Sequence, residues 1–272
     1  MACVAGIVVF NPDMVRLKEN IEAIITQVET VIVIDNGSKD KNEILTFLAP
    51  YKSAVCIRND ENMGIATALN QIVNKADELG YEWVLTLDQD SVCKPELIER
   101  YEAVIKKEKN LGMVSSQYAD RNVKIDFKND DEIKEVDFCI TSAAYTNIKA
   151  VKAVGGFDEK MFIDMVDYDI CYALKRNGYR IVRINYIGFL HEVGRSVERK
   201  FLGKKTIVFN HSHIRKYYWA RNTMYLMRKY NLSRLKEYKR ILKMILDTLF
   251  FEKEKFKKLR WMLKGIKDSK KL

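Results

Sequence analysis

The 272-residue sequence has few of the residues that interrupt or cross-link a chain. It contains three prolines and twelve glycines, so no low-complexity linker stands out, and we find no internal repeat. The five cysteines are odd in number and scattered, and no two of them have the spacing of metal ligands. We therefore expect reduced thiols, as in a cytosolic protein.

Long apolar stretches are also missing. No run of 18 apolar residues exists, so no membrane-spanning helix is expected. The chain starts with an expected strand and shows no signal peptide, which favours a cytoplasmic location. Residues 1–15 contain a single glycine, Gly6. A glycine-rich, lysine-bearing loop that wraps a triphosphate is therefore absent, which disfavours a pyrophosphorylase.

The net charge of +10 is unevenly distributed. Residues 1–198 carry a net charge of −8, whereas 199–233 and 234–272 each carry +9. An acidic body with a basic C-terminal third favours a tail that meets an anionic surface. The acidic body and the lack of any recognisable motif argue against a nucleic-acid-binding protein.

Hydrophobic periodicity predicts strands that alternate with helices. Strands are expected at 3–10, 30–34, 54–57, 83–87, 113–118, 136–144 and 180–190. Helices are expected at 13–27, 41–49, 65–79, 95–107, 149–154, in the second half of 161–175, and from about 210 to the end. Residues 119–135 are polar and are expected to form a surface excursion. This order predicts an α/β fold with a mostly parallel central sheet flanked by helices.

Two aspartates end the apolar run at 83–87. Asp88 and Asp90 follow it, with Ser91 beside them. Side chains alternate along a strand, so both carboxylates are expected to point the same way from its carboxyl end, where open α/β sheets bind ligands. Such oxygen ligands suit a hard divalent cation that also takes phosphate oxygens. The alternative is a solvated turn and a helix cap.

Other strands are expected to end at the same edge. Asp35 ends the second strand and could accept a hydrogen bond from a pyrimidine imide, or could form a local turn. Phe10 and Asn11 end the first strand, where an aromatic ring could cover a base or lie in the core. Asn62 and Gly64 precede a helix and offer backbone N–H groups, although an ordinary helix cap also explains them.

An acidic cluster follows farther along the chain. Asp164, Asp167 and Asp169 lie among aromatic and apolar residues. One of them could be a general base whose pKa is raised by burial and by its neighbours. The alternative is a helix start that favours acidic residues. His191 follows the last strand and would be an additional metal ligand if it lies near two aspartates.

The segment 211–222 mixes cations with aromatic residues. Arg215 and Arg221 could clamp phosphate oxygens of a diphosphate or an acceptor. Alternatively, the segment is a basic helix that packs its aromatic residues on the core.

These pieces occur in the order found in one family. The chain resembles the family 2 glycosyltransferases, which are inverting enzymes with a GT-A fold and nucleotide-sugar donors. The matching pieces are Val-Val-Phe-Asn at 8–11, Ile-Asp-Asn-Gly-Ser-Lys-Asp at 34–40, Asn-Met-Gly-Ile-Ala at 62–66 with Asn70, Asp-Gln-Asp at 88–90, Val-Gly-Gly-Phe-Asp-Glu at 154–159, the acidic cluster and His191. Within the family the chain is most similar to bacterial rhamnosyltransferases, through 87–91, 162–169 and 215–222.

The resemblance implies a role for each matched position. Asp35 would bind the base of a uridine or thymidine diphosphate, and Asp88 and Asp90 would form the Asp-X-Asp motif that contacts the nucleotide and Mg²⁺ or Mn²⁺. His191 would complete the metal or diphosphate site. The implied nucleotide-binding set is Phe10, Asn11, Asp35, Asn62, Gly64 and Asp88.

Asp167 falls at the position of the family's catalytic base. That base usually follows an acidic residue, whereas Val166 precedes Asp167 here, so Asp164 is an alternative base. The implied reaction is a single displacement in which the base takes a proton from an acceptor hydroxyl. It would move rhamnose from dTDP-rhamnose to a saccharide or lipid-linked saccharide in cell-surface polysaccharide synthesis. The alternatives are a UDP-hexose-dependent member of the family, a sugar-nucleotide-binding scaffold and a basic nucleic-acid-binding protein.

The basic tail has its own pattern. Residues 234–272 contain two amphipathic runs with Tyr, Phe and Trp, typical of helices that lie on an anionic membrane. We expect a GT-A catalytic domain at 1–210, a basic, aromatic-rich helical extension at 211–272, and peripheral contact of 234–272 with the inner face of the cell membrane. The alternative is that these helices pack on the catalytic domain or on a second copy in a homodimer.

Overall fold

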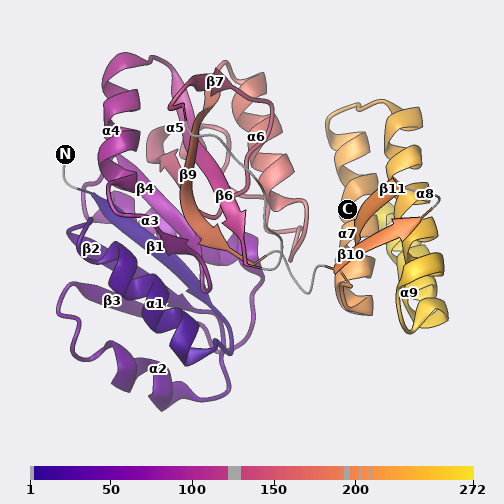
Figure 1. The fold of residues 1–272 in the computed structure, drawn as a ribbon, viewed down its shortest axis with the longest axis horizontal. Helices are drawn as coiled ribbons and strands as arrows, with labels where there is room; N and C mark the ends of the chain where they lie inside the picture. The colour runs from indigo at the N-terminus through magenta and orange to yellow at the C-terminus, as the bar shows by residue number, and fades with distance from the viewer. Residues whose placement is uncertain (1–2, 122–129, 193–196, 202–203, 209) are drawn as a thin grey trace. The chain divides into compact units, whose positions relative to one another are not determined.

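A computed structural model describes residues 3–121, 130–192, 197–201, 204–208 and 210–272. The chain forms two compact units (Figure 1). The first comprises residues 1–119, 125–159 and 167–191, and the second comprises 120–124, 160–166 and 192–272. The expected division at residue 210 stays a prediction. Of the predicted surface excursion at 119–135, residues 122–129 lie outside the described residues, whereas Ile133–Glu135 form a strand, β7, at the sheet.

The first unit is built on a central sheet whose first half is parallel. Its strand order is β3-β2-β1-β4-β8-β6-β9-β5, and β7 pairs with β9. The parallel strands are β1 (Val4–Val9), β2 (Thr30–Asp35), β3 (Ala54–Arg58) and β4 (Trp83–Asp88). Val9 of β1 pairs with Asp35, and Val8 pairs with Asp88. Both aspartates therefore lie at the carboxyl edge of the sheet, on the two strands that flank β1.

Helices flank this sheet, which confirms the α/β prediction. They are α1 (Met14–Ile24), α2 (Lys41–Leu48), α3 (Ile65–Glu78), α4 (Leu97–Lys107), α5 (Ile148–Ala153) and α6 (Val166–Arg176). The α1 helix begins where the Asp13 carboxylate accepts two backbone N–H groups, and Asp40 does the same for α2. A Cβ on Gly6 of β1 would lie 2.2 Å from Ile72 of α3, so the glycine lets this helix pack closely on the sheet.

Beyond β4 the pairs β4–β8, β8–β6, β7–β9 and β9–β5 are antiparallel. These strands are β5 (Val92–Cys93), β6 (Leu111–Asp120), β7 (Ile133–Glu135), β8 (Ala144–Asn147) and β9 (Arg180–His191). The strand predicted at 136–144 is wrong, because pairing with β4 begins only at Ala144. The preceding residues curl instead: the Thr86 hydroxyl donates to Thr141 O at 2.6 Å, and Ala143 N–H donates to Thr86 O at 2.7 Å. This curl brings Ser142 to the end of β4.

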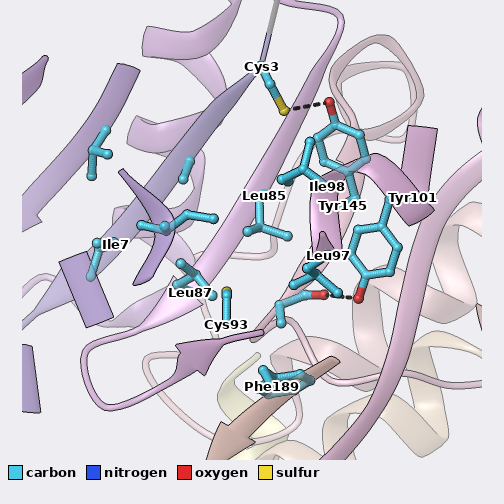
Figure 2. Close-up of a cluster of buried hydrophobic side chains, with 14 of the residues drawn as sticks. Cys3, Ile7, Leu85, Leu87, Cys93, Leu97, Ile98, Tyr101, Tyr145 and Phe189 are labelled. Atoms are coloured by element: carbon cyan, nitrogen blue, oxygen red, sulfur yellow. Dashed lines mark hydrogen bonds between the residues drawn. The ribbon is translucent and has the colours of Figure 1, made fainter. Parts of the chain in front are cut away.

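Apolar side chains fill the space between the sheet and its helices (Figure 2). Leu85, Tyr101, Tyr145 and Phe189 are each at most 1% exposed. Burying such a side chain contributes roughly 1.5–3 kcal/mol. The buried hydroxyls are satisfied, since Tyr101 donates to Ala143 O at 2.8 Å and Tyr145 lies 2.9 Å from Cys3 Sγ. All five cysteines are free thiols.

The second unit is mainly helical. It contains the antiparallel strands β10 (Val197–Phe201) and β11 (Lys204–Val208), then α7 (His213–Lys229), α8 (Arg234–Phe251), α9 (Lys255–Asp268) and a short 3₁₀ helix, η1 (Ser269–Lys271). A Cβ on Gly265 of α9 would lie 2.3 Å from Tyr217 O, so α9 crosses α7 at a glycine. The described helices include none that is both long enough and apolar enough to span a membrane.

A buried ion cluster joins the helices of the second unit. The Glu252 carboxylate, after α8, accepts hydrogen bonds from Lys216 of α7 at 2.6 Å and from Lys258 of α9 at 2.7 Å. All three side chains are at most 6% exposed. Breaking such a buried pair costs about 3–5 kcal/mol because one charge is left without a partner, so this cluster fixes how the three helices pack.

Candidate active site

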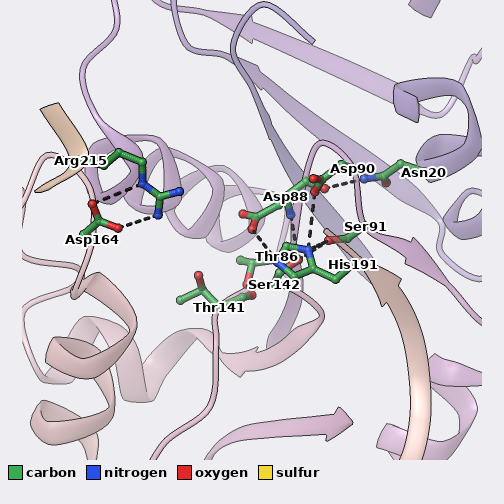
Figure 3. Close-up of polar contacts among 10 residues, drawn as sticks. All are labelled: Asn20, Thr86, Asp88, Asp90, Ser91, Thr141, Ser142, Asp164, His191 and Arg215. Atoms are coloured by element: carbon green, nitrogen blue, oxygen red, sulfur yellow. Dashed lines mark hydrogen bonds and ion pairs between the residues drawn. The ribbon is translucent and has the colours of Figure 1, made fainter. Parts of the chain in front are cut away.

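The predicted metal ligands come together in the first unit (Figure 3). Asp88 ends β4, Asp90 lies in the turn that follows, and His191 ends β9. Their ligand atoms all lie within 4.8 Å of one another. His191 Nε2 is 4.0 Å from Asp88 Oδ2, and Nδ1 is 3.6 Å from Asp90 Oδ1. The two carboxylates were predicted to point the same way because side chains alternate along a strand. Asp90 lies in a turn after β4, so it is the turn that brings its carboxylate to the same side as Asp88.

Polar residues around the cluster hold it in place. Ser91 Oγ lies 2.9 Å from His191 Nδ1 and 2.7 Å from Ser142 Oγ, and Ser142 Oγ accepts Asp88 N–H at 3.1 Å. Asn20 of α1 donates to Asp88 O at 2.6 Å. The sequence prediction missed Ser142 and Asn20, because both approach from segments far from residue 88 along the chain.

Two carboxylates and one imidazole suit Mg²⁺ or Mn²⁺. The Asp88 side chain is 43% exposed and that of Asp90 is 25% exposed, so both oxygens can meet a ligand from solvent. The His191 side chain is 12% exposed and is held by hydrogen bonds. The residues present therefore fit a divalent cation with positions left for ligand oxygens.

Asp35 lies at the end of β2, on the other side of β1 from β4, and is 1% exposed. Its Oδ1 accepts Ser38 N–H at 2.9 Å, and Arg58 Nη1 lies 3.3 Å from Oδ2. Among the described residues, Oδ2 accepts no hydrogen bond. The Arg58 ion pair offsets the charge on this buried oxygen, and a ligand N–H is one group that could supply the hydrogen bond that it does not have.

The other predicted nucleotide contacts surround this edge. Phe10 is 42% exposed, and its N–H donates to the Gln89 side chain at 2.8 Å. Asn11 donates its N–H to Ser38 Oγ at 2.8 Å and accepts from Lys39 N–H at 3.0 Å. The two residues thus tie the end of β1 both to the Asp88–Asp90 turn and to the Asp35 loop.

Asn36 organises the loop that carries Asn62 and Gly64. It is 3% exposed, accepts Met63 N–H at 3.0 Å and donates to Gly64 O at 3.1 Å. The Asn62 side chain accepts Gly64 N–H at 2.9 Å. Gly37 has φ +82°, and a Cβ there would lie 2.4 Å from the backbone of Glu61, so this Asn-Gly pair is required for the approach of the two loops.

The two candidate bases belong to different units. Asp167 lies in the first turn of α6, in the first unit, and is partly buried. Asp164 belongs to the second unit, has φ +65°, and pairs with Arg215 of α7 through contacts of 2.6 and 3.4 Å. The Asp164 side chain is 7% exposed, and burial raises its pKa although Arg215 opposes the shift.

The second unit also holds the backbone before Asp167. Asn222 of α7 is fully buried, and its Nδ2 donates to Ile163 O at 2.9 Å and to Asp164 O at 2.8 Å. Arg221 donates to Lys160 O at 2.6 Å. We call residues 160–166 the acidic loop. The sequence prediction missed Asn222 as a contact of this loop, although it lay inside the quoted 211–222 segment.

The sequence of the chain matches one family of known proteins. The model for glycosyl transferase family 2 matches residues 5–159. The dTDP-rhamnosyl transferase RfbF of Shigella flexneri is 27% identical over 287 residues, covering 96% of this chain and 92% of that protein.

Solved structures share the fold at low identity. S. aureus TarS 1–349 in complex with UDP-GlcNAc has a TM-score of 0.63 and 14% identity, covering 99% of this chain and 80% of that one. The mannosyltransferase PcManGT from Pyrobaculum calidifontis, in complex with GDP-Man and Mn²⁺, has a TM-score of 0.60 and 13% identity, covering 99% and 75%. The chain spans only 44% of a longer TarS chain. With a central sheet that carries the Asp88–Asp90–His191 cluster at its edge, and a family match over more than half its length, the chain belongs to glycosyl transferase family 2 and has a GT-A fold.

Proposed function

We propose that this glycosyltransferase moves a sugar from a nucleoside diphosphate donor to an acceptor hydroxyl with inversion at the anomeric carbon. The observation that carries the proposal is the Asp88–Asp90–His191 cluster at the same sheet edge as Asp35. Rhamnose from dTDP-rhamnose is the proposed donor, supported by the similarity to the Shigella flexneri dTDP-rhamnosyl transferase.

The nucleotide is proposed to bind along the ends of β1 and β2. The Asp35 carboxylate would accept the imide N–H of the base, which supplies the donor that Oδ2 lacks among the described residues. The exposed ring of Phe10 would cover the base, and backbone groups near Asn11, Asn62 and Gly64 would contact the rest of the nucleoside.

Asp88, Asp90 and His191 would hold Mg²⁺ or Mn²⁺, which stabilises negative charge on the diphosphate as it leaves. Arg215 and Arg221 stay predicted contacts of the diphosphate or the acceptor. In the structure they bind the acidic loop, Arg215 through Asp164 and Arg221 through Lys160 O. To bind a ligand, each arginine would have to contact it while keeping its bond to the acidic loop.

Asp167 is the proposed catalytic base. It would take the proton from the acceptor hydroxyl while that oxygen attacks the anomeric carbon and the bond to the diphosphate breaks. Asp164 is not the proposed base, because its carboxylate is 7% exposed and already held by Arg215 through two contacts, so an acceptor hydroxyl would have to compete with that ion pair. Asp164 is better suited to positioning the loop.

The proposed acceptor is a saccharide or a lipid-linked saccharide in the synthesis of a cell-surface polysaccharide. The enzyme would work in the cytoplasm at the inner face of the cell membrane, with peripheral contact through residues 234–272. The high positive charge of that segment supports this location. The alternative partner for the same segment is a second copy of the chain in a homodimer.

Two matched variants test the base. Asp167→Asn should lower donor turnover about 10²–10⁴-fold, the usual contribution of a general base, while donor affinity stays unchanged. Asp164→Asn keeps the side-chain shape and should lower turnover much less. Donor hydrolysis and donor affinity are measured for both. A fully active Asp167→Asn enzyme would refute the assignment, and the reverse pattern would make Asp164 the base.

A further inference from the structure

The α8 helix has an exposed apolar face along its whole length. Its inward side chains are Glu237, Ile241 and Thr248. The large outward apolar side chains are Leu235 (67% exposed), Tyr238 (51%), Leu242 (54%), Leu246 (42%), Leu249 (37%) and Phe250 (53%). At 3.6 residues per turn these six lie within an arc of about 120°, and we call them the α8 stripe. Exposed apolar surfaces of this extent typically mark interaction sites.

The cations of α8 lie beside the stripe. Lys236, Lys239 and Lys243 are all exposed, and the helical angles place Lys239 within the arc and the other two along one border. The acids of α8 face elsewhere. Glu237 is buried against Arg240 at 3.3 Å, and Asp247 pairs with Lys243 at 2.7 Å. The stripe therefore combines apolar side chains with positive charge and carries no acid.

The α9 helix differs from α8. Its Met262 and Gly265 are buried, and the helix packs closely on α7. Phe256 and Leu263, at 85% and 63% exposed, are its large exposed apolar side chains. They are two turns apart, so they do not form a continuous stripe. Of the two amphipathic runs in the tail, α8 presents the longer apolar surface.

We propose that the α8 stripe lies on the surface of an anionic lipid bilayer. Its apolar side chains would enter the boundary between headgroups and acyl chains, and its lysines would meet anionic headgroups. An 18-residue helix is about 27 Å long, enough to present all six side chains to one flat surface.

Charge complementarity favours lipid over a second copy of the chain. Two α8 stripes packed face to face would bring Lys239 and its neighbours of both copies together without an opposing acid. The cores of protein interfaces are depleted in lysine, whereas lysines at a membrane extend their charged ends to the headgroups. This inference sharpens the membrane contact proposed above, and it can fail or hold independently of sugar transfer because vesicle binding needs no donor.

The test uses the full chain and phosphatidylcholine vesicles with and without phosphatidylglycerol. The wild type should sediment with the phosphatidylglycerol vesicles, and less so as salt rises. The double variant Leu242→Glu/Leu246→Glu should bind at least about tenfold more weakly, because charge enters the apolar contact. The control Leu45→Glu/Leu79→Glu changes leucines of the first unit that are 51% and 45% exposed, and it should bind like the wild type.

A second variant separates the charged contribution from the apolar one. Lys236→Gln/Lys239→Gln/Lys243→Gln should lose most of the salt-sensitive part of binding and keep the fold, which thermal unfolding checks. Two results would overturn the proposal: vesicle binding unchanged in the Leu242/Leu246 variant, or no binding by the wild type. A lipid-free wild-type dimer that this variant converts to a monomer would also overturn it, since a second copy would then cover the stripe.

Discussion

The position of the His191 ring depends on two serine hydroxyls. Ser91 Oγ contacts Nδ1, and Ser142 Oγ links Ser91 to the backbone N–H of Asp88. Histidine ligands commonly bind a metal through one ring nitrogen while the other is held by a polar neighbour, which fixes the tautomer. A hydrogen bond from Nδ1–H to Ser91 would make Nε2, 4.0 Å from Asp88 Oδ2, the metal ligand.

Removal of the Ser91 hydroxyl should therefore weaken metal binding. Ser91→Ala leaves Asp88, Asp90 and His191 in place and should lower Mn²⁺ affinity about 10–100-fold, the usual effect of losing a residue that orients a metal ligand. The affinity is measured by titration of Mn²⁺ without donor, followed by electron paramagnetic resonance.

Ser115→Ala is the matched control. Ser115 is also buried, but its hydroxyl donates to Val182 O at 3.3 Å and not to His191. Equal losses of Mn²⁺ affinity in both variants would show that a packing defect, and not the orientation of His191, is responsible.

The sequence predicted the residues of the proposed metal site better than the residues that hold them in place. Asp88 and Asp90 follow an apolar strand, a pattern visible within a few residues. Ser142 contacts the same site because a curl in the chain replaces the end of a predicted strand. Asn222 contacts Asp164 O across 58 residues. Local sequence patterns carry no information about contacts between residues so far apart along the chain.

At the scale of elements, α7 is the support of the acidic loop. Asn222 donates to Asp164 O, and Arg221 donates to Lys160 O. Arg215 pairs with the Asp164 carboxylate. The Phe162 ring stacks on the Tyr218 ring, with 5.1 Å between the ring centroids. Asp164 and Met165 both have positive φ. Such backbone costs about 1–3 kcal/mol per residue, so these contacts are what hold the loop just before Asp167.

Asn222→Ala should lower turnover more than donor affinity. The change leaves two part-buried carbonyls without this donor, at a cost of up to roughly 1–3 kcal/mol each, and frees the loop that precedes the proposed base. Turnover and donor affinity are measured in the same preparation. Thr223→Ala is the control, because its buried hydroxyl donates to Trp219 O within α7 itself. Donor affinity that falls in parallel with turnover in Asn222→Ala would contradict the positioning role.

Helices and strands with a regular hydrophobic pattern were predictable from the sequence, whereas the way in which strands pair in the sheet was not. The helix predicted at 65–79 is α3, from Ile65 to Glu78, because its apolar positions recur at helical spacing. The parallel strands β1 to β4 were predictable as apolar runs. In the second half of the sheet, the strands predicted at 113–118 and 180–190 are β6 and β9. Their order and direction were not predictable, since these depend on partners far along the chain. In the tail, the helical pattern was visible, but only the structure separates the outward Leu246 from the half-buried Ile245.

The whole molecule combines an acidic sheet unit with a basic helical unit. The charge division was visible in the sequence, but the compact units do not follow it strictly, because residues 160–166 belong to the second unit. The segment that ends immediately before Asp167 is thus structurally part of the basic unit. For a family 2 glycosyltransferase this means that substitutions in α7 should affect catalysis without touching the metal cluster.

The most direct test of the account is donor binding with and without metal. Thermal unfolding and donor hydrolysis are measured with dTDP-rhamnose, UDP-glucose, UDP-galactose and UDP-N-acetylglucosamine, each in Mn²⁺ and in EDTA, for the wild type and Asp90→Ala. In Mn²⁺, dTDP-rhamnose should stabilise the wild type against unfolding by about 2.7 kcal/mol at a hundredfold excess over Kd. The wild type should also hydrolyse dTDP-rhamnose in Mn²⁺. EDTA or the Asp90→Ala substitution should abolish both the stabilisation and the hydrolysis. A response to a UDP-sugar instead would overturn the rhamnose assignment, and equal donor binding in EDTA would contradict the metal site itself.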